Sequence, residues 1–591
     1  MDLPGALEQH FGFTGFRPGQ REACEAALAG RDVLVVMPTG SGKSLCYQLP
    51  ALMRDDLTIV VSPLVALMQD QVEALHARGL GDAVALVNAQ QDGEQNAEVL
   101  RRAVAGRLRL LYVAPERFSS LGFLTGVKEA RVGLFVVDEA HCVSQWGHDF
   151  RPDYFRLADA ARHLGARAIV ASTATATPRV ALDVVRRLGL REPLRVATGF
   201  DRPNISFAVA RPAPHEKRTL IAQALRREDA LPAIVYAGTR AGAEEIAEQL
   251  CRELGEETLA YHAGLAREAR ADAQRRFLTD EARVIVATNA FGMGIDKPNV
   301  RTVIHASVPS SLEAYYQEAG RAGRDGLPAR ALLLAENRDK ALHVHFIKRD
   351  EVDPGLPAAL ADRLTAAADG EGRYAVDARE LAGALGGGAD RLRALLGHLA
   401  RAGVVSPSPS SPDRVAGRLT APFDRRAAAA CRSSIEDGAG ARWRQYREIW
   451  AYVENGACRR RAVLRHFGDR ADPVARPGGL PCCDVCDHGL VPELPPPDPE
   501  LVADLDDAIL SVARGARPAV GRTTCAEILH GARSKKIQRN SYDGLPAYGT
   551  SSGMRRADIL ARVDELIEDG RIETTGGAYP VLRMPARAAA A

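Results

Sequence analysis

The fold of this chain is most constrained by a regular alternation that runs from Phe16 to about Leu334. Short apolar runs rich in β-branched residues are separated there by helical patterns. Such alternation predicts parallel sheets with helices packed on both faces. The stretch is long enough for two doubly wound domains, which we expect at residues 1–200 and 201–350, with the boundary near residues 199–204. The predicted strands include 33–37, 58–62, 110–113, 134–137, 168–171, 233–236, 284–287 and 302–305.

The pattern changes after about residue 350, where helical periodicity dominates. Residues 378–385, with Asp377 as a candidate N-cap, and residues 390–402 predict two helices, the second with leucines along one face. A similar apolar face at 559–567 precedes a turn at 574–577. Both segments predict helix-turn-helix followed by a β-wing, although two unrelated small helical domains would give the same pattern. We expect an inserted winged-helix-like domain at 351–435, which contacts DNA or a partner or serves for packing.

Composition excludes several classes of protein. The chain is 46% hydrophobic and 26% charged, and no apolar run approaches the ~20 residues that span a membrane. The first residues carry no export signal, and the mostly isolated cysteines are typical of a reducing compartment, so we expect a cytoplasmic protein. The formal net charge of +2 predicts no general affinity for nucleic acid. Any nucleic-acid surface must therefore be local.

A glycine-rich loop follows the first predicted strand. Residues 37–44 read Met-Pro-Thr-Gly-Ser-Gly-Lys-Ser. Glycines let backbone N–H groups converge on phosphates, Lys43 can reach the terminal phosphates, and the Ser44 hydroxyl can bind Mg²⁺. Taken alone, with Met37 where the strict pattern has glycine, the loop could be a chance match. The candidate nucleotide-binding residues are Thr39, Gly40, Ser41, Gly42, Lys43 and Ser44.

Two adjacent carboxylates, Asp138 and Glu139, end another predicted strand. An aspartate at such a position can hold Mg²⁺, and the next carboxylate can polarise an attacking water. A surface acidic pair is the alternative. The preceding phosphate loop favours an ATP-hydrolysing site instead.

The order of these and later motifs resembles that of superfamily 2 helicases, whose motor consists of two RecA-like domains. The resemblance implies that Thr239 and Arg240 contact nucleic-acid phosphates and that Asp296 belongs to the nucleotide site. It also implies that Arg321 or Arg324 reaches the γ-phosphate when the cleft closes. Plain surface arginines are the alternative. The matching segments are 138–141, 172–175, 236–240, 261–264, 287–296 and 317–324.

Three further features resemble the RecQ family of bacterial DNA helicases. The first is Phe16-Arg17-Pro18-Gly19-Gln20, where the resemblance implies that Phe16, Arg17 and Gln20 bind the nucleotide, Gln20 on the adenine edge. The second is the aromatic-rich loop within 138–154. Aromatic faces there can stack on exposed bases, although Trp146 in the core is the alternative. The DNA-contacting candidates in this loop are Gln145, Trp146, His148, Phe150 and Arg151.

The third feature is a group of cysteines near residue 470. We predict one structural Zn²⁺ bound by Cys458, Cys482, Cys483 and Cys486. The family spaces its last three cysteines by two residues each, whereas here Cys482 and Cys483 are adjacent. His466 or His488 could replace one of the adjacent cysteines, and a metal-free cluster is a further alternative. The basic helix with Arg459, Arg460, Arg461 and Arg465 is expected to contact phosphates rather than serve as a solvated face.

The last segments, 527–537 and 545–549, resemble the C-terminal winged helix of the family. We expect a zinc-binding domain at 436–495 and, beyond the proline-rich linker 492–498, a winged helix at 496–591. Positive charge at Arg533, Lys535 and nearby residues predicts duplex binding. The wing 574–578 has no aromatic tip before Tyr579, so its role in strand separation is open.

Taken together, the resemblance implies an ATP- and Mg²⁺-dependent DNA helicase with 3′→5′ polarity in repair or recombination. It also implies a monomer that acts on single-stranded/duplex junction DNA near the nucleoid, with a single-stranded-DNA-binding protein as partner. Two alternatives stay open: an RNA helicase, and a DNA-binding regulator that uses ATP only as a conformational switch.

Overall fold

The computed structural model describes residues 2–88, 91–119, 121–144, 152–212, 216–292, 297–349, 351–408, 413–470, 473, 476–493, 499–532, 534–552, 554–576 and 580–585. Several predicted positions lie outside this part of the chain: the linker residues 494–498, Tyr579, and the site residues Gln145, Trp146, His148, Phe150, Arg151, Asp296 and Arg533.

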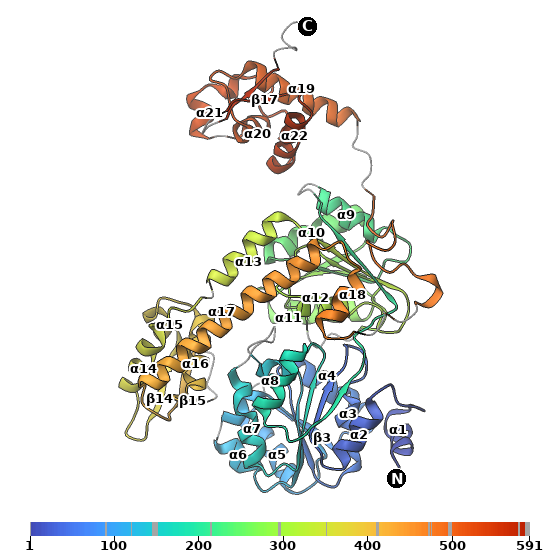
Figure 1. Ribbon diagram of the computed structural model, residues 1–591, viewed down its shortest axis with the longest axis vertical. Helices are drawn as coiled ribbons and strands as arrows, with labels where there is room; N and C mark the ends of the chain where they lie inside the picture. The colour runs from blue at the N-terminus through green and yellow to red at the C-terminus, as the bar shows by residue number, and fades with distance from the viewer. Residues whose placement is uncertain are drawn as a thin grey trace.

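The first domain contains a seven-stranded sheet in the order β3-β4-β2-β5-β6-β1-β7, with every neighbouring pair parallel. Helices cover both faces of the sheet (Figure 1). The strands are β1 (Val33–Val36), β2 (Leu57–Val61), β3 (Val84–Val87), β4 (Leu110–Val113), β5 (Val132–Val137), β6 (Ala168–Thr173) and β7 (Leu194–Ala197). The helices are α1 (Leu3–Phe11), α2 (Gln20–Leu28), α3 (Leu45–Met53), α4 (Val65–His76), α5 (Gly93–Val104), α6 (Leu121–Val127), α7 (Leu157–His163), α8 (Pro178–Leu188), and the short turns η1 (Pro115–Ser119), η2 (Ala140–Val143) and η3 (Pro152–Arg156).

The second domain has a six-stranded parallel sheet in the order β10-β11-β9-β12-β13-β8. Its strands are β8 (Ile205–Ala210), β9 (Ala233–Tyr236), β10 (Thr258–Tyr261), β11 (Val284–Ala287), β12 (Thr302–His305) and β13 (Ala329–Leu334). Its helices are α9 (Glu216–Leu225), α10 (Arg240–Leu254), α11 (Arg267–Leu278), α12 (Leu312–Ala319) and α13 (Asn337–Arg349). The prediction of two doubly wound parallel-sheet domains is confirmed.

The central strands are apolar on both faces, because helices bury each face of a parallel sheet. In β2, Ile59 and Val61 belong to one buried cluster, whereas Val60 between them belongs to the cluster on the opposite face. Helix starts follow local chemistry. The Thr177 side chain accepts the Val180 N–H at the start of α8.

An inserted module follows α13. Its order is α14 (Leu356–Ala366), β14 (Arg373–Asp377), α15 (Ala378–Ala384), α16 (Ala389–Arg401), β15 (Val405–Ser408) and β16 (Arg414–Leu419). The three strands form an antiparallel sheet in the order β14-β16-β15, which is the arrangement of a winged helix. Helix α16, at the position of a recognition helix, packs against α14, α15 and α17 (Arg425–Glu454), and against η3 of the first domain. The described part of this helix is thus packed on the first domain as well as on its own module.

Helix α17 (Arg425–Glu454) runs without a break through the expected boundary at residues 435/436. Gly438 and Gly440 are residues that weaken a helix. The helix nevertheless continues through them, because the side chains of Cys431, Ser434 and Ala441 are buried. It extends from the inserted module to the second domain, where it contacts α12 and α13 (Figure 1). The inserted module and the cysteine module therefore share this helix.

The cysteine module consists of the end of α17, α18 (Arg459–His466), η4 (Pro477–Gly479) and the segment around Cys482. It packs along β8, an edge strand of the second sheet. Phe207 N–H donates to Cys482 O at 3.1 Å, and Asp484 N–H donates to Phe207 O at 3.1 Å. The module thereby supplies hydrogen bonds to an otherwise open sheet edge.

The C-terminal domain has its own buried cluster and lies beyond α9, at the far end of the molecule from the first domain (Figure 1). No helix in the described residues is long and apolar enough to cross a membrane. The elements of the C-terminal domain are α19 (Pro499–Gly515), α20 (Arg522–His530), α21 (Lys535–Arg539), η5 (Tyr542–Gly544), α22 (Arg556–Glu568), β17 (Glu573–Thr574) and β18 (Leu582–Arg583), the last two paired antiparallel.

Candidate functional site

The order of the first sheet brings the motifs of the first domain together. β5, β6 and β1 are neighbours, so their carboxyl ends place Asp138, Ser172 and the phosphate loop at one edge. Ligand sites of open parallel sheets lie at such edges. Both Gly40 and Gly42 have φ of +82°, a conformation that favours glycine. The loop leads into α3, which begins directly after Ser44, and a helix N-terminus that follows such a loop suits a phosphate.

The entry segment packs directly on the phosphate loop. Buried Gln20 donates through Nε2 to Ser41 O at 3.2 Å and Gly42 O at 3.0 Å, and its Oε1 accepts the Arg17 N–H at 2.8 Å. The Arg17 guanidinium donates to Gly40 O at 2.7 Å. Phe16 packs against the core beneath. Gln20 thus supports the loop carbonyls, a role that the sequence did not suggest.

Asp138 and Glu139 are both buried at the end of β5. Burial and the neighbouring Glu139 carboxylate together raise the pKa of Asp138 to about 7, although Lys43 and Ser172 act in the opposite direction. Glu139 has φ of +48°, an uncommon backbone conformation for this residue type. His141 Nδ1 lies 3.3 Å from Glu139 Oε2 and 3.0 Å from Thr173 Oγ1, so it connects the acidic motif to the end of β6.

Arg321 and Arg324, which the sequence left as equivalent candidates, occupy different surroundings. Arg321 is buried beside Tyr236, within the second domain. Arg324 lies against the phosphate loop of the first domain, where a Cβ on Gly40 would come within 3.4 Å of its Cγ. Arg324 is therefore the arginine of this pair that reaches the phosphate loop.

A residue that the sequence did not single out joins the two sides of the cleft. Arg202 lies in the segment that connects the sheets, and it donates to Thr39 O in the phosphate loop and to Gly320 O beside Arg321. The sequence marked this segment only as a domain boundary. A single half-buried arginine in a connecting loop gives no periodic signal.

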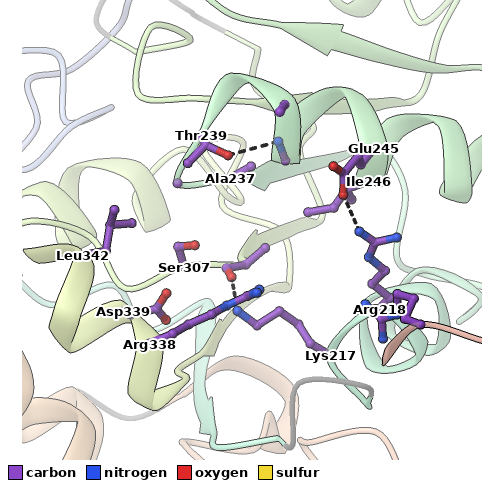
Figure 2. Close-up of a pocket in the computed structure, with 15 residues that line it drawn as sticks. Lys217, Arg218, Ala237, Thr239, Glu245, Ile246, Ser307, Arg338, Asp339 and Leu342 are labelled. Atoms are coloured by element: carbon purple, nitrogen blue, oxygen red, sulfur yellow. Dashed lines mark hydrogen bonds and ion pairs between the residues drawn. The ribbon is translucent and has the colours of Figure 1, made fainter. Parts of the chain in front are cut away.

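A second site opens at the carboxyl ends of the neighbouring strands β9 and β12 (Figure 2). It is a cavity of about 500 Å³, lined by Thr239 and the first turn of α10, by Ser307 and by Arg218. Thr239 Oγ1 accepts the Gly242 N–H at 3.0 Å, so its hydroxyl proton can still be donated to a ligand. Arg240, the first residue of α10, is exposed. A helix N-terminus with arginines nearby suits a phosphate.

The floor of this cavity is held by a buried ion pair. Lys217 Nζ lies 2.7 Å from Glu336 and donates to Ala306 O at 2.5 Å. Asp339 Oδ2 accepts the amides of Val308 and Glu336. Arg555 of the C-terminal domain also lines the cavity.

The thiols of Cys458, Cys482, Cys483 and Cys486 lie within 4.8 Å of one another. Cys458 Sγ and Cys482 Sγ are 3.7 Å apart, close to the ~3.8 Å that tetrahedral Zn–S bonds of 2.3 Å require. Burial acts to raise the pKa of Cys458, but the Arg461 amide and the neighbouring thiols outweigh it and lower the pKa. Four converging thiols therefore fit Zn²⁺.

The histidines weighed as substitute ligands lie outside this group. His466 Nε2 is 3.0 Å from Glu313 of α12, and His488 is exposed. The sequence could not place either residue, since the second domain supplies the partner of His466.

The expectation that the basic helix contacts phosphates is wrong for its first two arginines. Arg459 is buried and pairs with Asp484, and it also donates to Tyr452 O and Asn455 O. Arg460 is buried and pairs with Asp201. Arg461 and Arg465 are exposed. One side of the helix is therefore packed against the protein and the other is exposed. The composition of the helix does not indicate which arginines lie on which side.

The basic residues of the C-terminal domain are partly neutralised. Arg555 pairs with Asp558 at 2.8 Å, and Arg556 lies 3.5 Å from Glu527. Lys536 donates to Thr524 Oγ1 at 2.8 Å but is exposed, and Lys535 begins α21 beside it. On α21, Lys536 and Arg539 are both exposed.

Comparison with known families matches four segments of the chain. Residues 17–184 match the DEAD/DEAH box helicase model and residues 216–326 the helicase conserved C-terminal domain. Residues 429–487 match the RecQ zinc-binding model and residues 503–591 the RQC domain. Fold, cleft and family models together define a DEAD/DEAH-box type helicase.

Curated relatives narrow the class. The ATP-dependent DNA helicase RecQ of Bacillus subtilis is 32% identical over 579 residues, 98% of this chain and 81% of that protein. The RecQ helicase of Haemophilus influenzae is 45% identical over 57% of this chain and 53% of its own length. The probable ATP-dependent DNA helicase RecS of Bacillus subtilis is 35% identical over 83% of this chain and 92% of its own length. The chain belongs to the RecQ family of ATP-dependent DNA helicases.

Proposed function

We propose that this protein is an ATP- and Mg²⁺-dependent DNA helicase that moves 3′→5′ along one strand and serves repair or recombination. The observation that carries the proposal is a two-sided cleft. The phosphate loop and Asp138 lie on the first domain, and Arg324 of the second domain lies against Gly40. A nucleotide held between two domains couples its hydrolysis to their relative motion.

For hydrolysis, Lys43 binds the terminal phosphates, and the Ser44 hydroxyl and Asp138 carboxylate hold Mg²⁺. These are the hard oxygen donors that this ion prefers, and the nearby Lys43 charge opposes the rise in the pKa of Asp138 that burial and Glu139 cause. Mg²⁺ supplies charge neutralisation at the phosphates when bound. Glu139 orients the attacking water, and Arg324 places its charge at the γ-phosphate. Phe16, Arg17 and Gln20 frame the base side of the site.

For DNA binding, we assign the first turn of α10 to a backbone phosphate. Thr239 offers its hydroxyl there, and exposed Arg240 adds a positive charge. The exposed Lys536 and its neighbours on α21 bind duplex. The residues Gln145, Trp146, His148, Phe150 and Arg151 remain candidates for stacking and phosphate contact. We further propose that Cys458, Cys482, Cys483 and Cys486 bind one structural Zn²⁺.

For organisation, we propose motor domains at 1–200 and 201–350, the inserted module from 351, the zinc module up to 495 and the winged helix at 496–591. α17 is shared between the inserted module and the zinc module. We also propose a monomer that works at single-stranded/duplex junctions near the nucleoid in the cytoplasm, alongside a single-stranded-DNA-binding protein.

The test is unwinding of a partial DNA duplex that carries either a 3′ or a 5′ single-stranded tail, with ATP and Mg²⁺. We expect strand separation from the 3′ tail alone. The Lys43→Ala variant should bind the tailed DNA but not hydrolyse ATP, whereas Lys128→Ala, a change at an exposed lysine of the same domain, should behave as wild type. Unwinding of RNA duplexes alone, or a single turnover of ATP, would contradict the proposal.

A further inference from the structure

Arg202 makes four hydrogen bonds to main-chain carbonyls on both sides of the cleft. One terminal nitrogen donates to Thr39 O at 3.4 Å and to Gly320 O at 2.9 Å. The other donates to Ala322 O at 2.8 Å and to Gly323 O at 3.2 Å. Thr39 belongs to the phosphate loop, and the other three carbonyls flank the two arginines of the motif 317–324. A single guanidinium therefore joins the phosphate loop to the turn that carries Arg324.

Arg202 belongs to the segment 198–204 between β7 and β8, here called the connector. The rest of the connector is bound to the second domain. Tyr316 of α12 donates its hydroxyl to Phe200 O at 2.7 Å. Asn204 Nδ2 donates to Gly323 O at 2.7 Å and to Leu327 O at 2.9 Å. The connector and the turn that bears Arg324 are thus held together by hydrogen bonds. The hydrogen bond from Arg202 to Thr39 links both of them to the first domain.

The chemistry of the contact requires arginine. In the described part of the chain no carboxylate forms an ion pair with Arg202, so its partners are carbonyl oxygens. The planar guanidinium presents five N–H donors in a fixed fork, whereas a lysine ammonium offers three donors from a single point. Lysine would keep the charge but could not reach both sides of the cleft at once.

We propose that Arg202 is a positioning residue for ATP hydrolysis, which holds the turn of Arg324 at a set distance from the phosphate loop. The inference rests on the proposed hydrolytic function of the cleft. Displacement of a catalytic group by about 1 Å can cost on the order of 100-fold in rate. Arg202 thereby affects hydrolysis by setting the position of Arg324, and it does not contact the substrate itself.

The test compares DNA-stimulated ATP hydrolysis of the full chain with that of Arg202→Lys. We expect kcat to fall on the order of 100-fold, with KM for ATP and affinity for single-stranded DNA unchanged. The matched control is Arg54→Lys. Arg54 also donates to two main-chain carbonyls, Ala27 O and Leu28 O, but within the first domain alone. This control should retain the wild-type kcat.

The double variant Arg202→Lys/Arg324→Ala separates positioning from an independent role. If Arg202 acts through Arg324, the double variant hydrolyses ATP at the rate of Arg324→Ala alone. Multiplied losses would overturn the assignment. So would an Arg202→Lys enzyme with wild-type kcat, or one whose lost activity follows a larger fall in unfolding midpoint than Arg54→Lys shows. An inactive wild type would instead overturn the proposed function itself.

Discussion

Arg460 forms a two-pronged ion pair with Asp201, and both side chains are almost fully buried, with 4% and 9% exposed. Phe467, directly after α18, stacks on Phe200 with ring centroids 4.4 Å apart. The cysteine module is thereby fastened to the connector between the two sheets, one residue from Arg202. The module therefore contacts the same segment from which Arg202 reaches the cleft.

Replacement of Asp201 by Asn should destabilise the protein by about 3–5 kcal/mol, because it leaves the Arg460 charge buried without its partner. Urea unfolding measures the change. Glu248→Gln is the control, since it removes an exposed pair with Arg252 on α10 and should leave the free energy of unfolding unchanged within error. Equal effects of the two changes would show that the buried pair contributes no more than a surface one.

Arg240→Ala should weaken binding of single-stranded DNA through the loss of one phosphate contact. The slope of log K against log salt should then become shallower by about 0.7. Fluorescence anisotropy over a salt series provides the measurement. Arg252→Ala lies in the last turn of the same helix, away from the cavity at its N-terminus, and should leave the slope as in wild type. An unchanged slope for Arg240→Ala would remove this residue from the strand path.

Cys486→Ser should reduce bound zinc from about one equivalent to well below it, because one of four ligands is lost. Metal analysis of the purified protein tests this. Cys251→Ser, at an exposed cysteine outside the group, should keep its zinc, as should His488→Ala. Zinc lost from His488→Ala but kept by Cys486→Ser would reassign the ligand.

His466 should stabilise the protein in a pH-dependent way. Burial acts to lower its pKa, but the hydrogen bond and charge of Glu313, together with the charge of Glu448, outweigh burial and raise the pKa. Arg179 and Arg444 line the same cavity. Because the folded-state pKa exceeds the unfolded value of about 6.5, the stabilisation is full below about pH 6.5 and is lost as pH rises through the folded-state pKa.

Urea unfolding of wild type and His466→Gln across this pH range is the measurement. The variant should be less stable at low pH, and the difference should narrow as pH rises. His163→Gln, at an exposed histidine of the first domain, is the control and should follow wild type throughout. A difference that widens with pH would mean that His466 is held neutral.

The predicted strands 110–113, 233–236, 284–287 and 302–305 coincide with β4, β9, β11 and β12. Such agreement follows from the fold, because strands buried on both faces must be continuously apolar. The Asp377 cap is also present, with its side chain accepting the Arg379 and Glu380 amides. Caps and apolar runs are local, so a sequence displays them directly.

The sequence by itself determined the two parallel-sheet domains and the family. It also identified three separate motifs, which are the phosphate loop, the acidic pair and the group of cysteines. Each of these depends on residues that are close along the chain or repeat with a fixed period. Only the tertiary structure decided where each arginine lies and what it contacts. Arg324 lies at the phosphate loop whereas Arg321 is buried beside Tyr236, Arg459 and Arg460 are buried in ion pairs, and Arg202 bridges the cleft. The sequence does not indicate the direction in which an arginine side chain points, because its partners here lie up to 259 residues away along the chain.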